Sequence, residues 1–187
     1  MGNKIKYNIK NVHVAKQTYT GGVYSYETPV ALPGAVSLTM DAQGEDSPFY
    51  ADGVVYYRSK NNNGYSGSLE VAYVPDWFRT TILQELTDIN NVLVEKSDQN
   101  EDVRFALLFE FDGDVKCIRH VVYNVSASRP AVSSNTKEQA VTPVTESLSI
   151  AADPRDDKLV KARTADNTSN SVYNNWYGSV YVPTLAA

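Results

Sequence analysis

The feature that most constrains the fold is an alternation of apolar residues between positions 103 and 125. Val103, Phe105, Leu107, Phe109 and Phe111 occupy every second position, which places them on one face of an extended strand. Asp112-Gly113-Asp114 follows, and an Asp-Gly pair supplies the positive φ that a hairpin turn needs. A partner strand then carries one face of Val115, Cys117, Val121, Tyr123 and Val125. The sequence therefore predicts an antiparallel hairpin in a β-rich core.

A second β-rich region covers residues 36–74. Val36, Leu38 and Met40 alternate with polar residues, which predicts a half-buried strand. Segments 54–60 and 68–74 flank an Asn-rich segment ending in Asn63-Gly64, so we expect them to pair as a hairpin. The Gly- and Pro-containing segment 44–53 lies between these strands and is predicted to be a loop. Its aromatic residues, Phe49 and Tyr50, either pack over the sheet or are buried in a partner.

One amphipathic helix is expected directly after these strands. Pro75-Asp76 ends the strand, and Asp76 is a suitable N-cap because its side chain can accept from free backbone N–H groups. Phe78, Ile82, Leu83, Leu86 and Ile89 then recur at helical spacing and form one apolar stripe. We predict a helix over about residues 76–87 that flanks the sheet.

The remaining segments predict strands, loops and arms. Ile5, Tyr7 and Ile9 have the opposite parity to Val12 and Val14, so residues 1–11 form either a strand with a bulge near Lys10-Asn11 or an N-terminal arm. Polar residues in 126–143 predict a long surface loop. Strands are expected near Leu148 and Ile150 and over 159–164, a short helix over 171–177 capped by Thr168 or Ser169, and a C-terminal strand or tail over 179–187. The 187 residues suit a single, mainly β domain of sandwich or barrel type.

Composition limits the functions to consider. The formal net charge of −5 argues against general nucleic-acid binding, which needs clustered Lys and Arg. The single Cys excludes an internal disulfide and fits a reducing compartment. The first ten residues lack the apolar core of a signal peptide and no apolar run is long enough for a membrane span, so we expect a protein made and folded in a cytoplasm, without a membrane partner.

The sequence offers weak candidates for catalysis. Cys117 and His120 suggest a nucleophile and base, but residues three apart on a strand point to opposite faces. His13 and His120 have no His or Cys at metal-ligand spacing, and no phosphate-binding loop or dinucleotide fingerprint is present. We therefore expect no catalytic, metal or cofactor site, and no enzymatic activity.

Several segments along the chain together carry a family resemblance. They are Lys4–His13 at the start, Ala31-Leu32-Pro33-Gly34-Ala35-Val36, Phe49-Tyr50-Ala51-Asp52, Tyr56-Tyr57, Gly64-Tyr65-Ser66-Gly67-Ser68-Leu69-Glu70, Val74-Pro75-Asp76-Trp77-Phe78, the block from Phe105 to Tyr123, and Arg129-Pro130. With these segments, which cover most of its length, the chain resembles the major tail proteins, or tail-tube proteins, of long-tailed non-contractile bacteriophages. It departs from the family pattern at Asn91, where a Gly is expected, and in the absence of a Gly just after the predicted helix.

The resemblance implies a tail-tube β-sandwich with a flanking helix and extended loops. Six copies would form a ring, and stacked rings would form a tube around a tape-measure protein, with tail-terminator and distal-tail proteins at the ends. DNA would pass through the tube at ejection without specific binding. The protein would then be a structural component of the virion, made in the cytoplasm of the host bacterium, and would need no cofactor.

The residues suggest how such a tube would be lined and held together. Asp41 and Glu70 alternate with buried positions, so we predict that they face the lumen, where acidic groups repel DNA phosphates. Phe49, Tyr50, Tyr7 and Arg129 are the predicted subunit contacts. The alternative function is a monomeric β-sandwich module of a phage tail that binds carbohydrate or a receptor through exposed aromatic residues.

Overall fold

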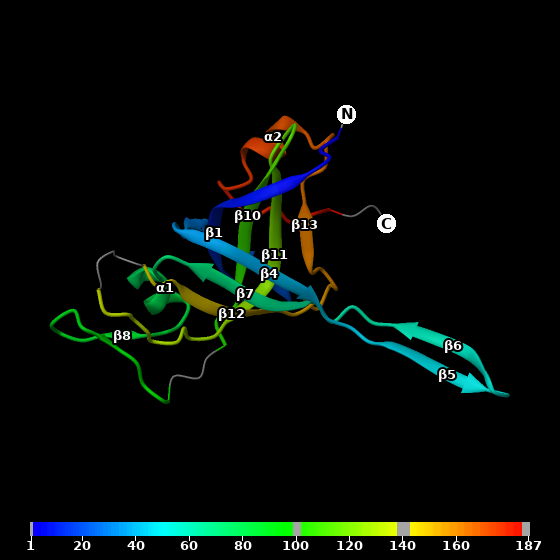
Figure 1. Cartoon of the computed structure of the whole chain (residues 1–187), viewed down its shortest axis with the longest axis horizontal. Helices are drawn as coiled ribbons and strands as arrows, with labels where there is room; N and C mark the ends of the chain where they lie inside the picture. Colours follow the sequence, from blue (N-terminus) through cyan, green and yellow to red (C-terminus); the bar gives the residue numbers. More distant parts are fainter. Residues whose placement is uncertain (1, 99–101, 138–142, 185–187) are drawn as a thin grey trace.

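The computed structural model describes residues 2–98, 102–137 and 143–184, and the chain is mainly β with two short helices. Its main sheet has the strand order β2-β1-β10-β11-β12-β7-β4, with all neighbours antiparallel (Figure 1). Short β3 (Val30–Ala31) pairs with β1, and β13 (Lys161–Arg163) pairs with β11. The other strands are β1 (Lys6–Thr20), β2 (Val23–Tyr26), β4 (Ala35–Ala42), β7 (Tyr65–Val71), β10 (Phe105–Gly113), β11 (Ile118–Ala127) and β12 (Glu146–Ala152).

The predicted central hairpin is confirmed as β10 and β11, and both faces of β10 are buried. Phe105, Leu107 and Phe109 point into a first core that also receives residues of β4, β7, β12 and helix α1. Ala106 and Leu108 point into a second core, which Trp176 and its neighbours in the C-terminal segment cover. Since β10 has no face to water along this length, its sequence is apolar at nearly every position.

Two details of the hairpin prediction are wrong. Gly113 ends β10 without a positive φ, and Val115 and Cys117 lie in the connection before β11 and not on that strand. The predicted face of β11 is also not continuous. Val121 and Tyr123 lie in the second core, whereas Val125 lies in the first core. The change of face coincides with Asn124, which has a φ of 52°, and with a shift in register opposite Phe105. A bulge of this kind reverses the side-chain alternation beyond it.

The N-terminal segment forms a bulged strand and not a free arm. Lys6 pairs with Gly113 and Tyr7 with Asp112 at the end of β10, and the register shifts again between Lys10 and His13. Asn11 has a φ of 52°, a conformation that Asn tolerates better than most residues. The predicted bulge near Lys10-Asn11 is therefore confirmed, and residues 6–11 belong to β1 and not to the N-terminal arm predicted over 1–11.

The pairing predicted for 54–60 is also wrong. The strand β6 (Val54–Lys60) pairs with β5 (Asp46–Ala51), and β7 pairs with β4 and β12. Segment 44–53 is thus largely a strand, and the turn lies at Asp52-Gly53, with φ values of 53° and 76°. Two consecutive positive φ angles are typical of a type I′ turn. The β5–β6 ribbon continues the β4–β7 ladder outwards through bonds such as that from the Gln43 N–H to the Gly64 carbonyl, 2.9 Å.

Helix α1 (Asp76–Thr81) is shorter than the 76–87 predicted, because Gln84 adopts a φ of 60° and Leu86–Thr87 forms a short strand, β8. Strand β8 pairs with β9 (Leu93–Val94). The N-cap is Pro75 rather than Asp76. Helix α2 (Asn170–Asn174) begins after Ser169, one of the two predicted caps, which makes no side-chain capping bond.

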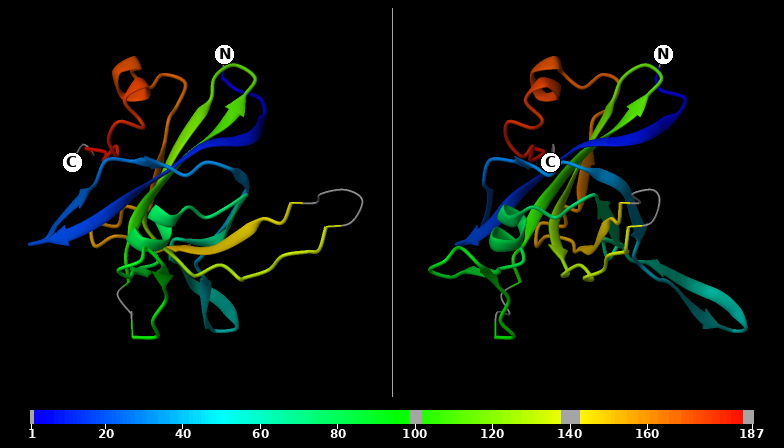
Figure 2. Two further views of the ribbon diagram at one scale, coloured as in Figure 1. Left: turned by 90° about the vertical axis from the view of Figure 1, so that its left-hand side faces the viewer. Right: turned by 60° about the vertical axis from the view of Figure 1, so that its left-hand side comes forward.

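The predicted loop and tail lie only partly within the described residues. Residues 128–137 are irregular and leave the end of β11 (yellow, Figure 2), whereas 138–142 and 185–187 lie outside the description. The predicted strand near Leu148 and Ile150 is β12, and 159–164 contains β13. Within the predicted tail, residues 179–184 form no strand. The tail packs on the body through Tyr181, whose ring stacks on that of Trp176 with 5.5 Å between the ring centroids.

Candidate functional site

A polar face covers the outer side of β4, β7 and β12, opposite the first core. The strands are in register, so that Ser37, Glu70 and Ser147 form one row and Thr39, Ser68 and Ser149 form the next. Asp41 and Ser66 form the third. We call these eight residues the hydroxyl face. None of the three strands contains a Lys or Arg, so this face offers no cation to a phosphate group.

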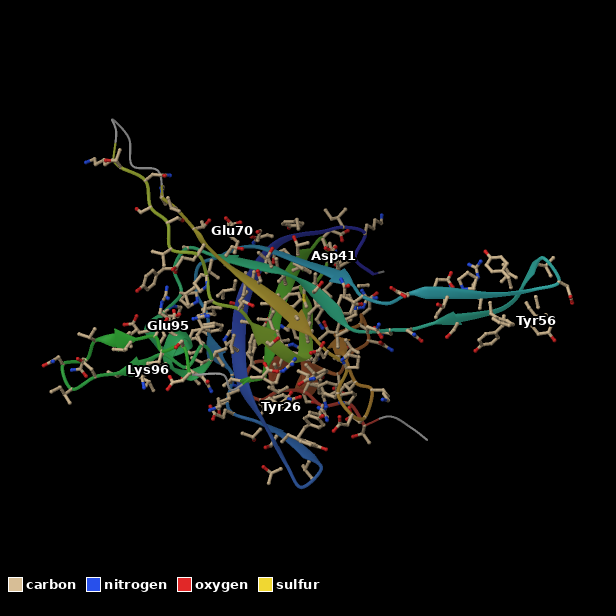
Figure 3. The ribbon with its side chains drawn as sticks, turned by 90° about the horizontal axis from the view of Figure 1, so that it is seen from below. Tyr26, Asp41, Tyr56, Glu70, Glu95 and Lys96 are labelled. Carbon is tan, nitrogen blue, oxygen red and sulfur yellow. The ribbon has the colours of Figure 1, made fainter. Side chains whose placement is uncertain are left out.

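The two predicted lumen residues share this face, as their alternation indicated (Figure 3). Glu70 accepts hydrogen bonds from the Thr145 hydroxyl and from the Ser37 hydroxyl, the latter at 2.9 Å. These two bonds, that from Thr145 first, hold the pKa of Glu70 below its usual range. Asp41 is exposed at the other end of the face. The face therefore carries two carboxyl groups, those of Asp41 and Glu70.

The β5–β6 ribbon, which we call the arm, projects away from the sheet (Figure 1 and the right-hand view of Figure 2). It contributes no residue to either core. An exposed ion pair links Arg58 to Asp46 across it at 2.7 Å. Its large apolar side chains are mostly exposed, from 42% for Val55 to 74% for Tyr56. They are Phe49, Tyr50, Val54, Val55, Tyr56 and Tyr57.

A second exposed apolar group lies at the opposite end of the long axis, on β8, β9 and the turn between them (Figure 1). The Asp88 carboxylate accepts from the N–H groups of Asn90 and Val92, both at 2.8 Å, and these bonds lower its pKa. Asn91 takes a φ of 61°, the conformation for which a Gly would be expected. The turn presents Ile89 to solvent with 98% of its surface exposed.

A pocket of about 200 Å³, which we call the root pocket, opens where β4 and β7 lead into the arm. Its floor includes Phe109 and His120, whose rings stack at 5.0 Å with an angle of 3°. Burial, with the nearby charges of Arg163, Lys161 and Lys6, lowers the pKa of His120 to about 4, so this ring is neutral at pH 7. The pocket is lined by Lys6, Leu38, Met40, Tyr65, Phe109, Phe111, His120, Val122 and Lys161.

The titratable residues considered for catalysis are held by separate partners. The Cys117 thiol donates to the Asp112 carboxylate at 3.2 Å, and burial raises the pKa of this thiol. His120 stacks on Phe109, and the His13 ring stacks on Tyr177 at 4.5 Å. Within the described ranges, no group of three or more His, Cys, Asp or Glu side chains could hold a metal ion.

The predicted contact residues fall in three places. Phe49 and Tyr50 lie together on the arm. Tyr7 is 55% exposed on β1, and Arg129 pairs with Glu95 beside β9. The sequence prediction missed that Ile89 belongs to the exposed apolar group on β8 and β9, because its spacing fitted the apolar stripe of the predicted helix. It also missed the position of Tyr56 and Tyr57, since the Asp52-Gly53 turn signal was not used.

No protein-family model matches this sequence, and no curated protein is similar to it. No helix in the described part of the chain is long and apolar enough to cross a membrane.

Proposed function

We propose that this chain is a structural subunit of a bacteriophage tail tube, and that it assembles with copies of itself into stacked hexameric rings. The observation that carries the proposal is the arm, a folded ribbon whose aromatic side chains have no core to enter in their own chain. Exposed apolar surface of this kind is typical of an interaction site. A second exposed apolar group, on β8 and β9, lies at the far end of the same chain (Figure 1).

This arrangement suits assembly that repeats in one direction. A contact between two different surfaces of the same subunit is heterologous, so it continues from copy to copy until a ring closes or a filament forms. Strand β4 also has a free edge, because within the described residues it pairs with β7 alone. A free strand edge is able to accept a strand from a neighbour, which supplies a second direction of contact.

The hydroxyl face suits the wall of a channel for DNA. Small hydroxyl side chains present a smooth polar surface, and Asp41 and Glu70 add negative charge without any neighbouring cation on the three strands. Proteins that bind DNA place several Lys or Arg side chains against its phosphates. The hydroxyl face instead has carboxylates and no Lys or Arg, and such a surface favours passage of DNA, or of a tape-measure protein before it, without retention.

The test is electron microscopy of the purified full chain at increasing concentration, combined with sedimentation. We expect rings or tubes from the wild type, and monomers from the triple variant Phe49→Ser, Tyr56→Ser, Tyr57→Ser. Val23→Ser serves as the control, because Val23 is 66% exposed on β2 and lies outside the arm. A wild-type chain that stays monomeric at all concentrations would overturn the proposal.

The alternative function has its own support in the arm, since Tyr50, Tyr56 and Tyr57 expose rings on which a sugar could stack. A monomer that binds an immobilised glycan, and loses this binding in the same triple variant, would favour the carbohydrate-binding module.

A further inference from the structure

The root pocket suits an apolar side chain that has a negatively charged group next to it. Leu38, Met40 and Val122 provide aliphatic walls, and no Asp or Glu lines the pocket. The Lys6 ammonium lies 5.2 Å from the Phe111 ring centroid, and that of Lys161 lies 4.2 Å from the Tyr65 ring centroid. Neither Lys has an ion-pair partner among the described residues.

The size of the pocket limits its occupant to one side chain. A cavity of about 150 Å³ is sufficient for a benzene-sized group, so the roughly 200 Å³ of the root pocket admits one branched aliphatic or aromatic side chain. Half-buried residues such as Leu38, Met40 and Phe111 would lose their remaining exposure when the pocket is filled.

The far end of the molecule carries a group with the matching chemistry. Ile89 is 98% exposed, and the Asp88 carboxylate beside it is fixed by two backbone N–H groups. Residues 84–98 contain Glu85, Asp88, Glu95 and Asp98 but a single cation, Lys96. Glu85, Glu95 and Asp98 are paired with Arg79, Arg129 and Lys96. Among these four carboxylates, Asp88 alone has no ion-pair partner among the described residues, whereas the root pocket is lined by the cations Lys6 and Lys161.

The two surfaces do not meet within one chain, because β8–β9 lies at one end of the long axis and the base of the arm lies on the other side of the body (Figure 1). We propose that the root pocket receives the Ile89 side chain of a second copy of this chain, with the Asp88 carboxylate of that copy beside Lys6 and Lys161. This contact rests on the proposed function and names the surfaces through which successive copies join. It also places the arm of one copy alongside β8–β9 of the next.

The experiment compares assembly of full-length variants by sedimentation. Ile89→Arg puts a cation against the basic rim, and we expect the protein concentration needed for assembly to rise by about tenfold or more. Val23→Arg is the matched control and assembles like the wild type. Thermal unfolding of the Ile89→Arg monomer stays unchanged, because Ile89 makes no core contact.

A compensating change makes the test specific. Combining Ile89→Arg with Lys161→Glu removes one cation from the rim and supplies a partner for the new Arg, so assembly recovers at least in part. In a Cys117→Ser background, a mixture of Ile89→Cys and Met40→Cys chains forms disulfide-linked dimers, whereas Ile89→Cys mixed with Val23→Cys does not.

The outcomes separate this inference from the proposed function. Suppose that the wild type assembles, that Ile89→Arg assembles at the same protein concentration, and that the Cys mixture forms no disulfide. The proposed contact of Ile89 with the root pocket is then wrong, while the tube proposal stands. If the wild type never assembles, both fall.

Discussion

Arg79 on α1 and Glu146 on β12 form an ion pair, with Nη2 of Arg79 2.6 Å from Oε1 of Glu146. Arg79 also reaches Glu85 at 3.3 Å, and the second oxygen of Glu146 accepts from the Val74 N–H at 2.5 Å. Both side chains are mostly buried, at 19% and 23% exposure. The pair therefore fixes α1, and the segment that leads to β8, against the first core.

Removing one partner of this pair is expected to destabilise the chain. Glu146→Ala removes the carboxylate that accepts hydrogen bonds from the Arg79 guanidinium and the Val74 N–H. We expect this loss to lower the free energy of unfolding by about 2–3 kcal/mol. Urea denaturation measures this loss. The matched control is Asp46→Ala, which breaks the exposed pair with Arg58 on the arm and costs less than about 1 kcal/mol. Equal losses in the two variants would contradict the prediction.

Two glycines at positive φ should respond differently to substitution. A Cβ at Gly64 would lie 1.9 Å from the Ala152 carbonyl oxygen, whereas nothing lies within 4 Å of one at Gly53. Gly64→Ala therefore costs more than about 3 kcal/mol or prevents folding. Gly53→Ala strains the arm turn by about 1–2 kcal/mol, and leaves thermal unfolding of the body unchanged. Circular dichroism melts of both variants provide the comparison.

His120 should make the folded state sensitive to acid. Its pKa in the folded chain is about 4, while that of the unfolded chain is about 6.5. Because the unfolded chain binds a proton that the folded chain excludes, stability falls as pH drops from about 6.5 towards 4, by about 3 kcal/mol.

His120→Phe keeps a ring against Phe109 and removes this titration. The difference in unfolding free energy between pH 7 and pH 4 should then shrink by about 3 kcal/mol relative to the wild type. Other groups also titrate in acid, such as Asp112, whose pKa of about 2 follows from hydrogen bonds with Lys10, Asn8 and Cys117. Since Asp112 is present in both proteins, its contribution cancels in the comparison. An unchanged difference would show that His120 is not protonated on unfolding in this range.

Reversing the charge of the hydroxyl face should convert assembled tubes into DNA binders. Asp41→Lys adds one cation per subunit to the proposed lumen, and DNA that enters would be retained at low salt and released as salt increases. Co-sedimentation of tubes with short duplexes measures retention. Glu27→Lys, which changes an exposed residue after β2, is the control with the same net charge. Equal retention by the two variants would place Asp41 outside the lumen.

Local patterns predicted much of the body. Alternation identified β4, β10 and β12, the parity change predicted the bulge in β1, and the same alternation placed Asp41 and Glu70 on one face. These features depend on residues close in sequence. The pairing of β6 with β5 was mispredicted because the prediction relied on the Asn63-Gly64 turn signal and overlooked Asp52-Gly53, which directly precedes β6.

The other features that the sequence did not predict have one local and two non-local causes. Helix α1 ends early because Gln84 leaves the helical conformation, although the apolar spacing continues as far as Ile89. Burial of both faces of β10 depends on Trp176, which lies far along the chain and packs on Ala106 and Leu108. The root pocket combines residues of β1, β4, β7, β10, β11 and β13, so no single stretch of sequence could reveal it.

The arm leaves both cores untouched and turns back at a tight two-residue bend open to solvent. Its sequence can consequently be rewritten, lengthened or exchanged for another ribbon without repacking the body. A foreign peptide grafted between Asp52 and Gly53 would be displayed well clear of the rest of the molecule.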